Sequence, residues 1–314
     1  MIQTPIDDSE LDAHLKHVAD DGIDIFLLQD GAFRGAMLHG TAMLNQMRAN
    51  HELGIAESLV LGHAYLAAGL MTSMVKGRDR VALDLNADGP ARGVAVEADA
   101  GGQIRGYLKT DAMDVTWEPQ SFDTAQFIGT SGSLSVSRIL EGAREAVTGH
   151  IEIEEGGIAR DLARYFTISE QTPTAINLSV QFDEAGRIVG AGGLFLQALP
   201  TAYPEERTEL DALVQHLDSI GASFRDGQTG ASIINRDLAD FHPEMIGTRP
   251  VAFVCRCSKE RFGRYLASLP NDEITDIREH GPFPLVTSCY NCNSHYEFTR
   301  EELEKLWTER QPER

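Results

Sequence analysis

The first 254 of the 314 residues contain no cysteine, and basic residues are scarce along the whole chain. Lys and Arg number 27 against 48 Asp and Glu, so the formal net charge is −21. A surface this acidic repels phosphate backbones and anionic lipids, so we expect neither nucleic acid nor a membrane surface as a partner. Residues 251–314 hold 9 basic and 11 acidic residues. Nearly all of the excess charge therefore lies in residues 1–250.

The sequence also lacks a basic, apolar leader and an uninterrupted hydrophobic run. The most hydrophobic stretch is Ile55–Val75, which contains Glu57 and His63 and is followed by Lys76. It is long enough to span a bilayer, but these polar residues favour a buried core helix. The start of the chain is acidic, with Asp7, Asp8, Glu10 and Asp12. These absences predict a soluble, cytoplasmic protein.

Hydrophobic residues make up 42% of the chain and charged residues 24%, which is enough apolar material for a sizeable core. Strand-like segments occur in runs, at Ile23–Leu28, Arg80–Leu85, Gly93–Glu97, Leu134–Arg138, Gly149–Ile153 and Asn177–Phe182. Helical patterns occur at Thr41–Met47, Ala56–Val75 and Ile158–Phe166. Strands grouped in runs with few helices predict an α+β fold with a mixed sheet and helix body.

Signals for catalysis are missing from this body. The glycine clusters Gly129–Gly132 and Gly190–Gly193 have no strand–turn–helix context and no P-loop lysine, so they are interpreted as turns or close backbone contacts. Ser169–Pro173 has no nucleophile elbow. His39, His51 and His63 are scattered and are expected in the core or on the surface. We do not expect an enzyme.

After Pro200 the pattern changes. Residues 202–250 are predicted to form a helical linker of modest intrinsic stability, with an apolar stripe of Leu210, Leu213, Val214 and Leu217. The predicted organisation is a body over residues 1–201, this linker, and a small C-terminal domain over residues 251–314.

All four cysteines lie in that C-terminal domain, as Cys255-Arg-Cys257 and Cys289-Tyr-Asn-Cys292, with 31 residues between the pairs. Two close pairs at such a separation present four thiolates to one tetrahedral ion, and we expect one Zn²⁺ per chain. Asn293 suits the left-handed backbone that a C-x-x-C knuckle often needs. His295 is a further potential ligand, but with four cysteines present we expect it to lie outside the coordination sphere.

Spacing alone leaves the role of these thiols open. A closed four-thiolate site argues against catalytic zinc and fits a purely structural metal. Cys255 and Cys257 could instead form a small strained disulfide, which is the labile and regulatory kind. Disulfide exchange or another metal are the remaining alternatives. The cations Arg256, Lys259 and Arg261 favour reactive thiolates, or they balance the charge of zinc thiolates.

The rest of the domain is predicted to be helical around the cysteines. Ser258 caps a helix that ends before Pro270, a second short helix ends at Gly281, and Thr299 forms a capping box with Glu302. Residues 251–314 contain few large apolar groups, so the domain depends on a metal for its stability. Bound zinc supplies roughly 10–16 kcal/mol of apparent folding free energy in such modules. Removing the metal is therefore expected to unfold the domain.

The C-x-C and C-x-x-C pairs, together with Cys257-Ser-Lys-Glu-Arg-Phe262 and Tyr296-Glu-Phe298, resemble the heat shock protein 33 family of redox-regulated holdase chaperones. The resemblance extends over nearly the whole chain, through Arg34-Gly35, Gly89-Pro90, Gly156–Ala159, Ser169–Thr174, Ala191–Gly193 and Gln197–Pro200. The chain departs from the family pattern at Asn291, where an aromatic residue is common, and after His51, where a Tyr-Pro pair is usual.

This resemblance implies a mechanism. The reduced protein holds zinc through Cys255, Cys257, Cys289 and Cys292 and is inactive. Oxidation by peroxide or hypochlorous acid forms the Cys255–Cys257 and Cys289–Cys292 disulfides, expels zinc and melts residues 251–314. The linker then loosens and exposes apolar surface, with Leu210, Leu213, Val214 and Leu217 among the groups that bind unfolding client proteins without ATP. The active form is expected to be a homodimer.

Two other functions compete with this hypothesis. A zinc-ribbon nucleic-acid-binding protein needs a basic face, and neither part of the chain is net positive. A thiol oxidoreductase needs an open metal position or a C-x-x-C that begins a helix within a βαβ unit, and Cys289-x-x-Cys292 is not in such a context.

Overall fold

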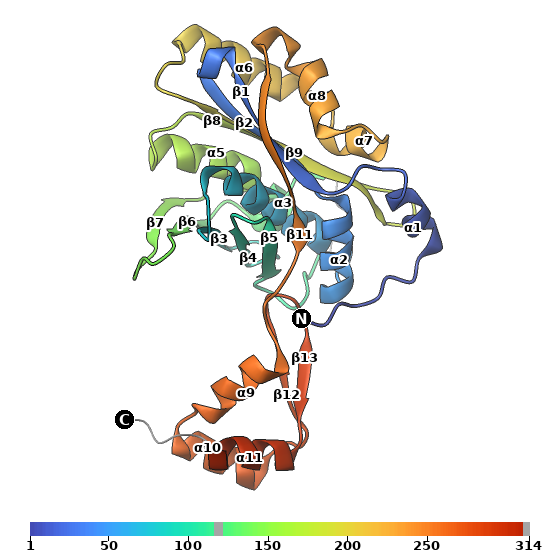
Figure 1. Cartoon of the computed structure of the whole chain (residues 1–314), viewed down its shortest axis with the longest axis vertical. Coiled ribbons are helices and arrows are strands. Elements are labelled where there is room, and N and C mark those ends of the chain that lie inside the picture. Colours follow the sequence, from blue (N-terminus) through green and yellow to red (C-terminus); the bar gives the residue numbers. More distant parts are fainter. Residues whose placement is uncertain (116–121, 310–314) are drawn as a thin grey trace.

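Two large sheets are stacked in the body, and helix α3 (Ile55–Met71) lies between them (Figure 1). The computed structural model describes residues 1–115 and 122–309. Within these ranges α3 packs against strands of both sheets, and 13 of its 17 residues are buried. The described residues include one segment long and apolar enough to cross a membrane, Ile55–Met74, and 78% of its apolar 18-residue window is buried inside the protein. The prediction of a core helix here is confirmed.

The first sheet is antiparallel throughout and has the order β10-β1-β2-β9-β8. Its strands are β1 (Gly22–Leu28), β2 (Phe33–His39), β8 (Thr174–Phe182), β9 (Ile188–Ala198) and β10 (Glu244–Pro250). Its residues alternate between two apolar cores: Ile23 faces α3, whereas Phe26 and Leu28 face the opposite side. The sheet is therefore buried on both faces, and its edge strands are β10 and β8.

The second sheet has the order β11-β5-β4-β3-β6-β7. Its strands are β3 (Arg80–Ala87), β4 (Gly93–Asp99), β5 (Gln103–Leu108), β6 (Gly132–Ile139), β7 (Val147–Glu152) and β11 (Ala252–Phe253). Alternate residues of β3 and β5 are buried, the pattern of strands with one face on a core. The two-residue strand β11 pairs parallel to β5 and attaches the start of the C-terminal domain to the body.

Shorter helices complete the body. They are α1 (Ser9–Leu15), η1 (Gln29–Gly31), α2 (Thr41–His51), η2 (Thr72–Met74), α4 (Ala125–Ile128) and α5 (Ile158–Ile168). The C-terminal segment of the body adds α6 (Pro204–His216), α7 (Ile220–Arg225), α8 (Gly230–Asp237) and η3 (Ala239–Phe241). These last helices cover the face of the first sheet opposite α3, where Phe224, Ile233 and Ile234 are buried in the second apolar core.

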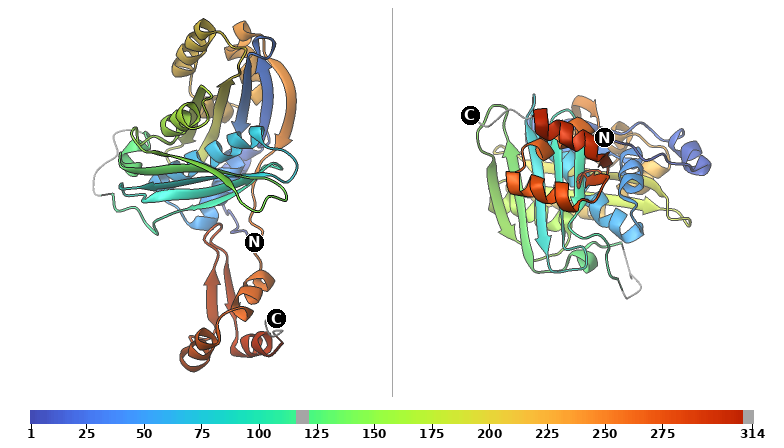
Figure 2. Two further views of the ribbon diagram at one scale, coloured as in Figure 1. Left: turned by 90° about the vertical axis from the view of Figure 1, so that its left-hand side faces the viewer. Right: turned by 90° about the horizontal axis from the view of Figure 1, so that it is seen from below.

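The C-terminal domain projects from one end of the body (Figures 1 and 2). Its elements are α9 (Lys259–Ala267), α10 (Asn271–His280), the hairpin of β12 (Leu285–Ser288) and β13 (His295–Phe298), and α11 (Arg300–Glu309). The predicted caps are present: Ser258 accepts from the Arg261 amide, and Thr299 and Glu302 exchange the two bonds of a capping box. Trp307 and Leu303 are among the few large buried side chains here, which agrees with the small predicted core.

The α+β prediction is confirmed, and the six predicted strands and three predicted helices of the body are present with small differences in length. Strands β2, β5 and β9 were not predicted in the body, nor were β10, β11 and the β12–β13 hairpin, so the C-terminal domain is less purely helical than expected. Strand β9 contains the Gly190–Gly193 cluster, whose glycines are needed for close approach: a Cβ on Gly190 would lie 2.0 Å from the Gly221 carbonyl oxygen. The interpretation as close backbone contacts is right, whereas that as turns is wrong for this cluster.

Residues 202–250 differ most from the prediction of a helical linker. Helices α6, α7 and α8 occupy its first part, but Glu244–Pro250 is the strand β10, paired along β1. Six of its seven residues are exposed, and the sequence has no alternation of apolar and polar residues, so the signal for a strand was absent. The linker is thus an integral part of the reduced body: its helices cover one sheet face and its last residues form one sheet edge.

Gly102 lies at the point where this segment leaves the body. It has φ +81°, its N–H donates to Asp99, and its carbonyl accepts from the Ala252 amide. An added Cβ would lie 2.1 Å from the Pro250 carbonyl oxygen. Only glycine fits between these two backbones.

We predict that Gly102→Ala lowers the free energy of unfolding by more than about 2 kcal/mol, because it adds a backbone clash to the strain of a left-handed residue. Gly142→Ala is the matched control: its φ is +78°, but an added Cβ meets no atom within 4 Å. It should cost only about 1 kcal/mol. Urea denaturation gives both values, and equal losses would contradict the prediction.

Candidate metal centre

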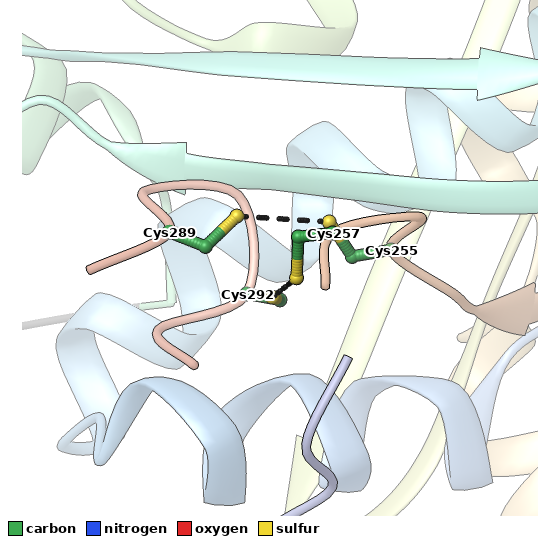
Figure 3. A group of neighbouring side chains, drawn as sticks. All are labelled: Cys255, Cys257, Cys289 and Cys292. Atoms are coloured by element: carbon green, nitrogen blue, oxygen red, sulfur yellow. Dashed lines mark hydrogen bonds between the residues drawn. The ribbon is translucent and has the colours of Figure 1, made fainter. Parts of the chain in front are cut away.

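Two backbone turns bring the four cysteines together (Figure 3). Cys255 and Cys257 follow β11, whereas Cys289 and Cys292 lie in the turn between β12 and β13. In that turn the amides of Cys292 and Asn293 both donate to the Cys289 carbonyl, at 3.1 and 2.7 Å. Asn293 has φ 52°, the left-handed conformation expected of it. The hairpin thus aims both of its sulfurs toward the C-x-C segment.

The sulfur positions suit a tetrahedral metal ion. All four Sγ atoms lie within 4.8 Å of one another, with 3.7 Å between Cys255 and Cys289 and 3.3 Å between Cys257 and Cys292. Zinc bound to four sulfurs at 2.3 Å would set them about 3.8 Å apart. Each cysteine is at most 7% exposed. Buried, convergent soft donors are the chemistry that zinc selects.

The charges of these thiols are strongly linked. Hydrogen bonds from Cys289 and Cys292 hold the pKa of Cys255 well below its usual range. The same hydrogen bonds, made to the Cys255 thiolate, raise the pKa of Cys289 and raise that of Cys292 to about 11. The Cys255 thiolate thus accepts hydrogen bonds from the Cys289 and Cys292 thiols. Four thiolates at this spacing need a cation to offset their mutual repulsion.

Polar side chains surround the sulfurs. The Tyr296 hydroxyl lies 3.2 Å from the Cys257 sulfur, and the Ser294 hydroxyl lies 3.2 Å from the Cys292 sulfur. Burial and the hydrogen bond to Cys257 raise the pKa of Tyr296, so it stays protonated as a donor. Such bonds orient metal-bound ligands and stabilise their charge.

The cation beside the sulfurs comes from the body. The Arg105 guanidinium on β5 lies 3.8 Å from the Cys255 sulfur and pairs with Glu97 at 3.1 Å. The three cations expected near the thiols are engaged elsewhere: Arg256 with Asp99 and Gln103, Lys259 with Glu302, and Arg261 with Tyr265. Sequence proximity pointed to those three, and nothing local to Cys255 indicates a residue 150 positions earlier.

His295 lies at the surface, where its Nδ1 is 2.7 Å from the Ser288 hydroxyl. It is not part of the sulfur cluster, as expected. His39 is in the core, stacked on Phe224, and burial lowers the pKa of the buried His63 to about 4.

The centre lies at the contact between the body and the C-terminal domain. The Asn50 side chain, 3% exposed at the end of α2, donates to the Cys292 carbonyl at 3.1 Å and to the Ile2 carbonyl at 2.8 Å. Asn293 donates back to the Asn50 carbonyl at 3.0 Å. On β5 the Gly106 amide donates to the Asn291 carbonyl at 3.3 Å. The body therefore contacts the backbone of the knuckle, residues 289–293, directly. Asn291 takes part through its backbone carbonyl.

The predicted client-binding residues are packed in this state. Val214 is 5% exposed and Leu213 and Leu217 are half-buried, all against the second apolar core. The side chain of Leu210 lies outside the described part of the chain. Partners for these apolar groups are thus provided by the first sheet.

The family profile described as Hsp33 protein matches residues 21–299. The chain belongs to the Hsp33 family. The 33 kDa chaperonin of Bacillus licheniformis is 33% identical over 279 residues, covering 88% of this chain and 95% of that protein. The 33 kDa chaperonin of Bacillus subtilis is 33% identical over 282 residues, covering 89% and 96%.

A solved Hsp33 homologue has the same fold. The crystal structure of the 33 kDa chaperonin from Thermotoga maritima superposes with a TM-score of 0.81 at 28% identity, covering 92% of this chain and 98% of that one. The family is one of chaperones by name, and the four clustered cysteines of this Hsp33 chain form a possible metal site within it.

We predict that Asn50→Ala weakens the docking of the knuckle by about 1–3 kcal/mol, because it leaves the buried Cys292 carbonyl without its donor. Asn45→Ala is the matched control, since Asn45 is also buried on α2 and donates to two carbonyls, those of Thr41 and Ile188, away from the centre. Both variants should lose stability, but only Asn50→Ala should speed hydrogen exchange in residues 289–294. Equal exchange in the two variants would show that the contact does not hold the knuckle.

Proposed function

We propose that this protein is a redox-regulated, ATP-independent holdase that binds unfolding proteins under oxidative stress. Cys255, Cys257, Cys289 and Cys292 hold one Zn²⁺ per chain in the reduced, inactive form. The proposal covers the three-part organisation as well: residues 1–201 as body, 202–250 as linker and 251–314 as switch. It places the protein in the cytoplasm, without nucleic acid or membrane partners.

The observation that carries this proposal is the position of the sulfur cluster at the contact between the body and the C-terminal domain. The cluster joins the two turns of the switch and also presents the knuckle backbone to Asn50 and Gly106. Zinc would supply the charge that holds four thiolates together. Loss of the cluster would remove both the link between the two turns and the backbone surface that contacts the body.

The redox step is balanced as two two-electron oxidations. In each pair two thiols lose two protons and two electrons and form one S–S bond, while one peroxide molecule is reduced to two waters. We propose the pairs Cys255–Cys257 and Cys289–Cys292, which are close in the chain. Disulfide sulfurs are poor ligands for zinc, so the ion leaves.

Unfolding of the switch would then release the linker. β11 and β10 lie immediately before Cys255, and the helices α6–α8 cover apolar groups of the first sheet. An isolated helix as short as α6 is marginal in water. The exposed apolar surface, including Leu213, Val214 and Leu217, binds clients, and the active form is proposed to be a homodimer. The acidic body keeps this surface soluble by like-charge repulsion.

We predict one zinc per chain after purification under reducing conditions and a loss of most of the zinc affinity in Cys257→Ser, because one of four thiolates is removed. Tyr296→Phe is the matched control: it keeps all four ligands and removes only the hydroxyl beside Cys257. It should retain its zinc. Metal analysis of the three proteins tests this, and zinc retained in Cys257→Ser would refute the ligand set.

We predict an order of unfolding on oxidation with mild heat. Residues 251–309 should lose hydrogen-exchange protection first, then residues 202–250 together with the edge of β1 that β10 covers. The rest of residues 1–200 should keep its protection, because the body has no cysteine and the largest core. Exchange mass spectrometry, zinc release and suppression of client aggregation are followed together. Client binding while residues 251–309 remain protected would show that the switch lies elsewhere.

A further inference from the structure

Strand β10 is held to the body mainly by its backbone. It pairs along β1 from Gly22↔Pro250 to Leu27↔Glu244, with an irregularity between Ile25 and Phe26. Six of its seven residues are exposed, including Met245 at 39% and Ile246 at 52%. A strand that buries so little apolar surface gains its stability from ladder hydrogen bonds, each worth about 1 kcal/mol net. Strand β10 is therefore held only weakly at the edge of the sheet.

Strand β1, by contrast, is fixed in the core. Ile23, Phe26 and Leu28 are 0% exposed, and β2 pairs with the other edge of the strand. Departure of β10 would leave β1 in place with a row of unpaired N–H and C=O groups. An open edge of this kind is a template for another extended chain.

The anchors of β10 lead to the cysteine centre. The Arg249 guanidinium donates to the carbonyls of Ala100 and Thr72, at 2.6 and 2.7 Å. The chain then enters β11 and reaches Cys255 five residues after Pro250. At the other end, Phe241 is buried in the core covered by α6–α8. Both ends of the strand thus continue into parts that oxidation is proposed to release, whereas the Arg249 hydrogen bonds hold it to the body.

We propose that the β1 edge of the oxidised protein binds an extended apolar segment of a client as an added strand in the place of β10. This inference rests on the proposed holdase function and specifies the kind of client segment that the holdase binds. A client residue opposite Phe26 that is β-branched or aromatic buries more apolar area against the sheet than exposed Met245 does. Main-chain bonds give affinity without a fixed sequence, which suits diverse clients.

The charge around the β1 edge limits which client segments can bind there. Asp24 lies on β1, Asp20 precedes the strand, and Asp30 follows it. An acidic edge repels acidic segments and favours neutral or basic ones. The captured class is therefore an extended, neutral or basic apolar segment in which proline is tolerated only at an end, as Pro250 is in β10.

A locked edge tests the proposal. Asp24 and Thr248 are direct partners in the β1–β10 register, so Asp24→Cys/Thr248→Cys places a disulfide across the two strands. Ser137→Cys/Thr148→Cys is the matched control, across the exposed partners on β6 and β7. Both variants should release zinc on oxidation. The locked variant should bind a client peptide more than about tenfold less tightly, and the control should bind as the parent does.

The probe is a short synthetic peptide of alternating valine and lysine, compared with the same peptide N-methylated at alternate amides. The N-methylated form keeps the side chains but cannot complete a ladder. Only the unmodified peptide should bind the oxidised protein and restore hydrogen-exchange protection to residues 22–28. Equal binding of the two peptides, or tight binding to the locked variant, overturns the proposal.

Two outcomes separate this inference from the proposed function. If the oxidised parent releases zinc and suppresses aggregation while the locked variant does so equally, the holdase stands and the β1 edge is not its site. Residues 22–28 protected without peptide, in a concentration-dependent way, would mean that a second copy pairs there, and this also overturns the proposal. If the oxidised parent neither releases zinc nor binds clients, the proposed holdase function itself is refuted.

Discussion

Four sulfur atoms buried within 4.8 Å of one another are the constraint on which the rest of this structure depends. A cation lets all four carry charge in so small a volume, and S–S bonds remove the charge covalently. These two solutions require different backbone paths, because a metal gathers both turns around one point and a disulfide joins two sulfurs within one turn. The fold of the C-terminal domain is consistent with the first arrangement.

The body contacts this cysteine centre through backbone carbonyls of the knuckle. Asn50 and Gly106 bind carbonyls of the knuckle, which are in position only while the turn between β12 and β13 keeps its shape. Arg105 adds the single contact between a body side chain and a sulfur, among the described residues. A body without cysteine is thereby in direct contact with the turn that carries two of the four cysteines.

The sequence predicted what is local and what is strongly patterned. The caps at Ser258 and Thr299 were predictable, since each depends on residues three positions apart. The four sulfurs were predictable because their spacing is characteristic of a metal site. Strand β10 was not, because its side chains face solvent and carry no periodic signal. Arg105 and Asn50 were not either, since their positions beside the cysteines follow from contacts across 150 and more than 240 residues.

The pairing of β1 with β10 has a consequence for synthesis. Gly22 pairs with Pro250, so the first strand of the first sheet gains its outer neighbour only after most of the chain has been translated. Such long-range pairing carries a large loop-closure cost and forms late. On the ribosome, β1 and β2 can pair early, whereas the outer edge of β1 stays open until residue 250 has emerged. During much of its synthesis, the nascent chain therefore exposes unpaired backbone groups along the edge of β1. The finished protein covers that edge with β10.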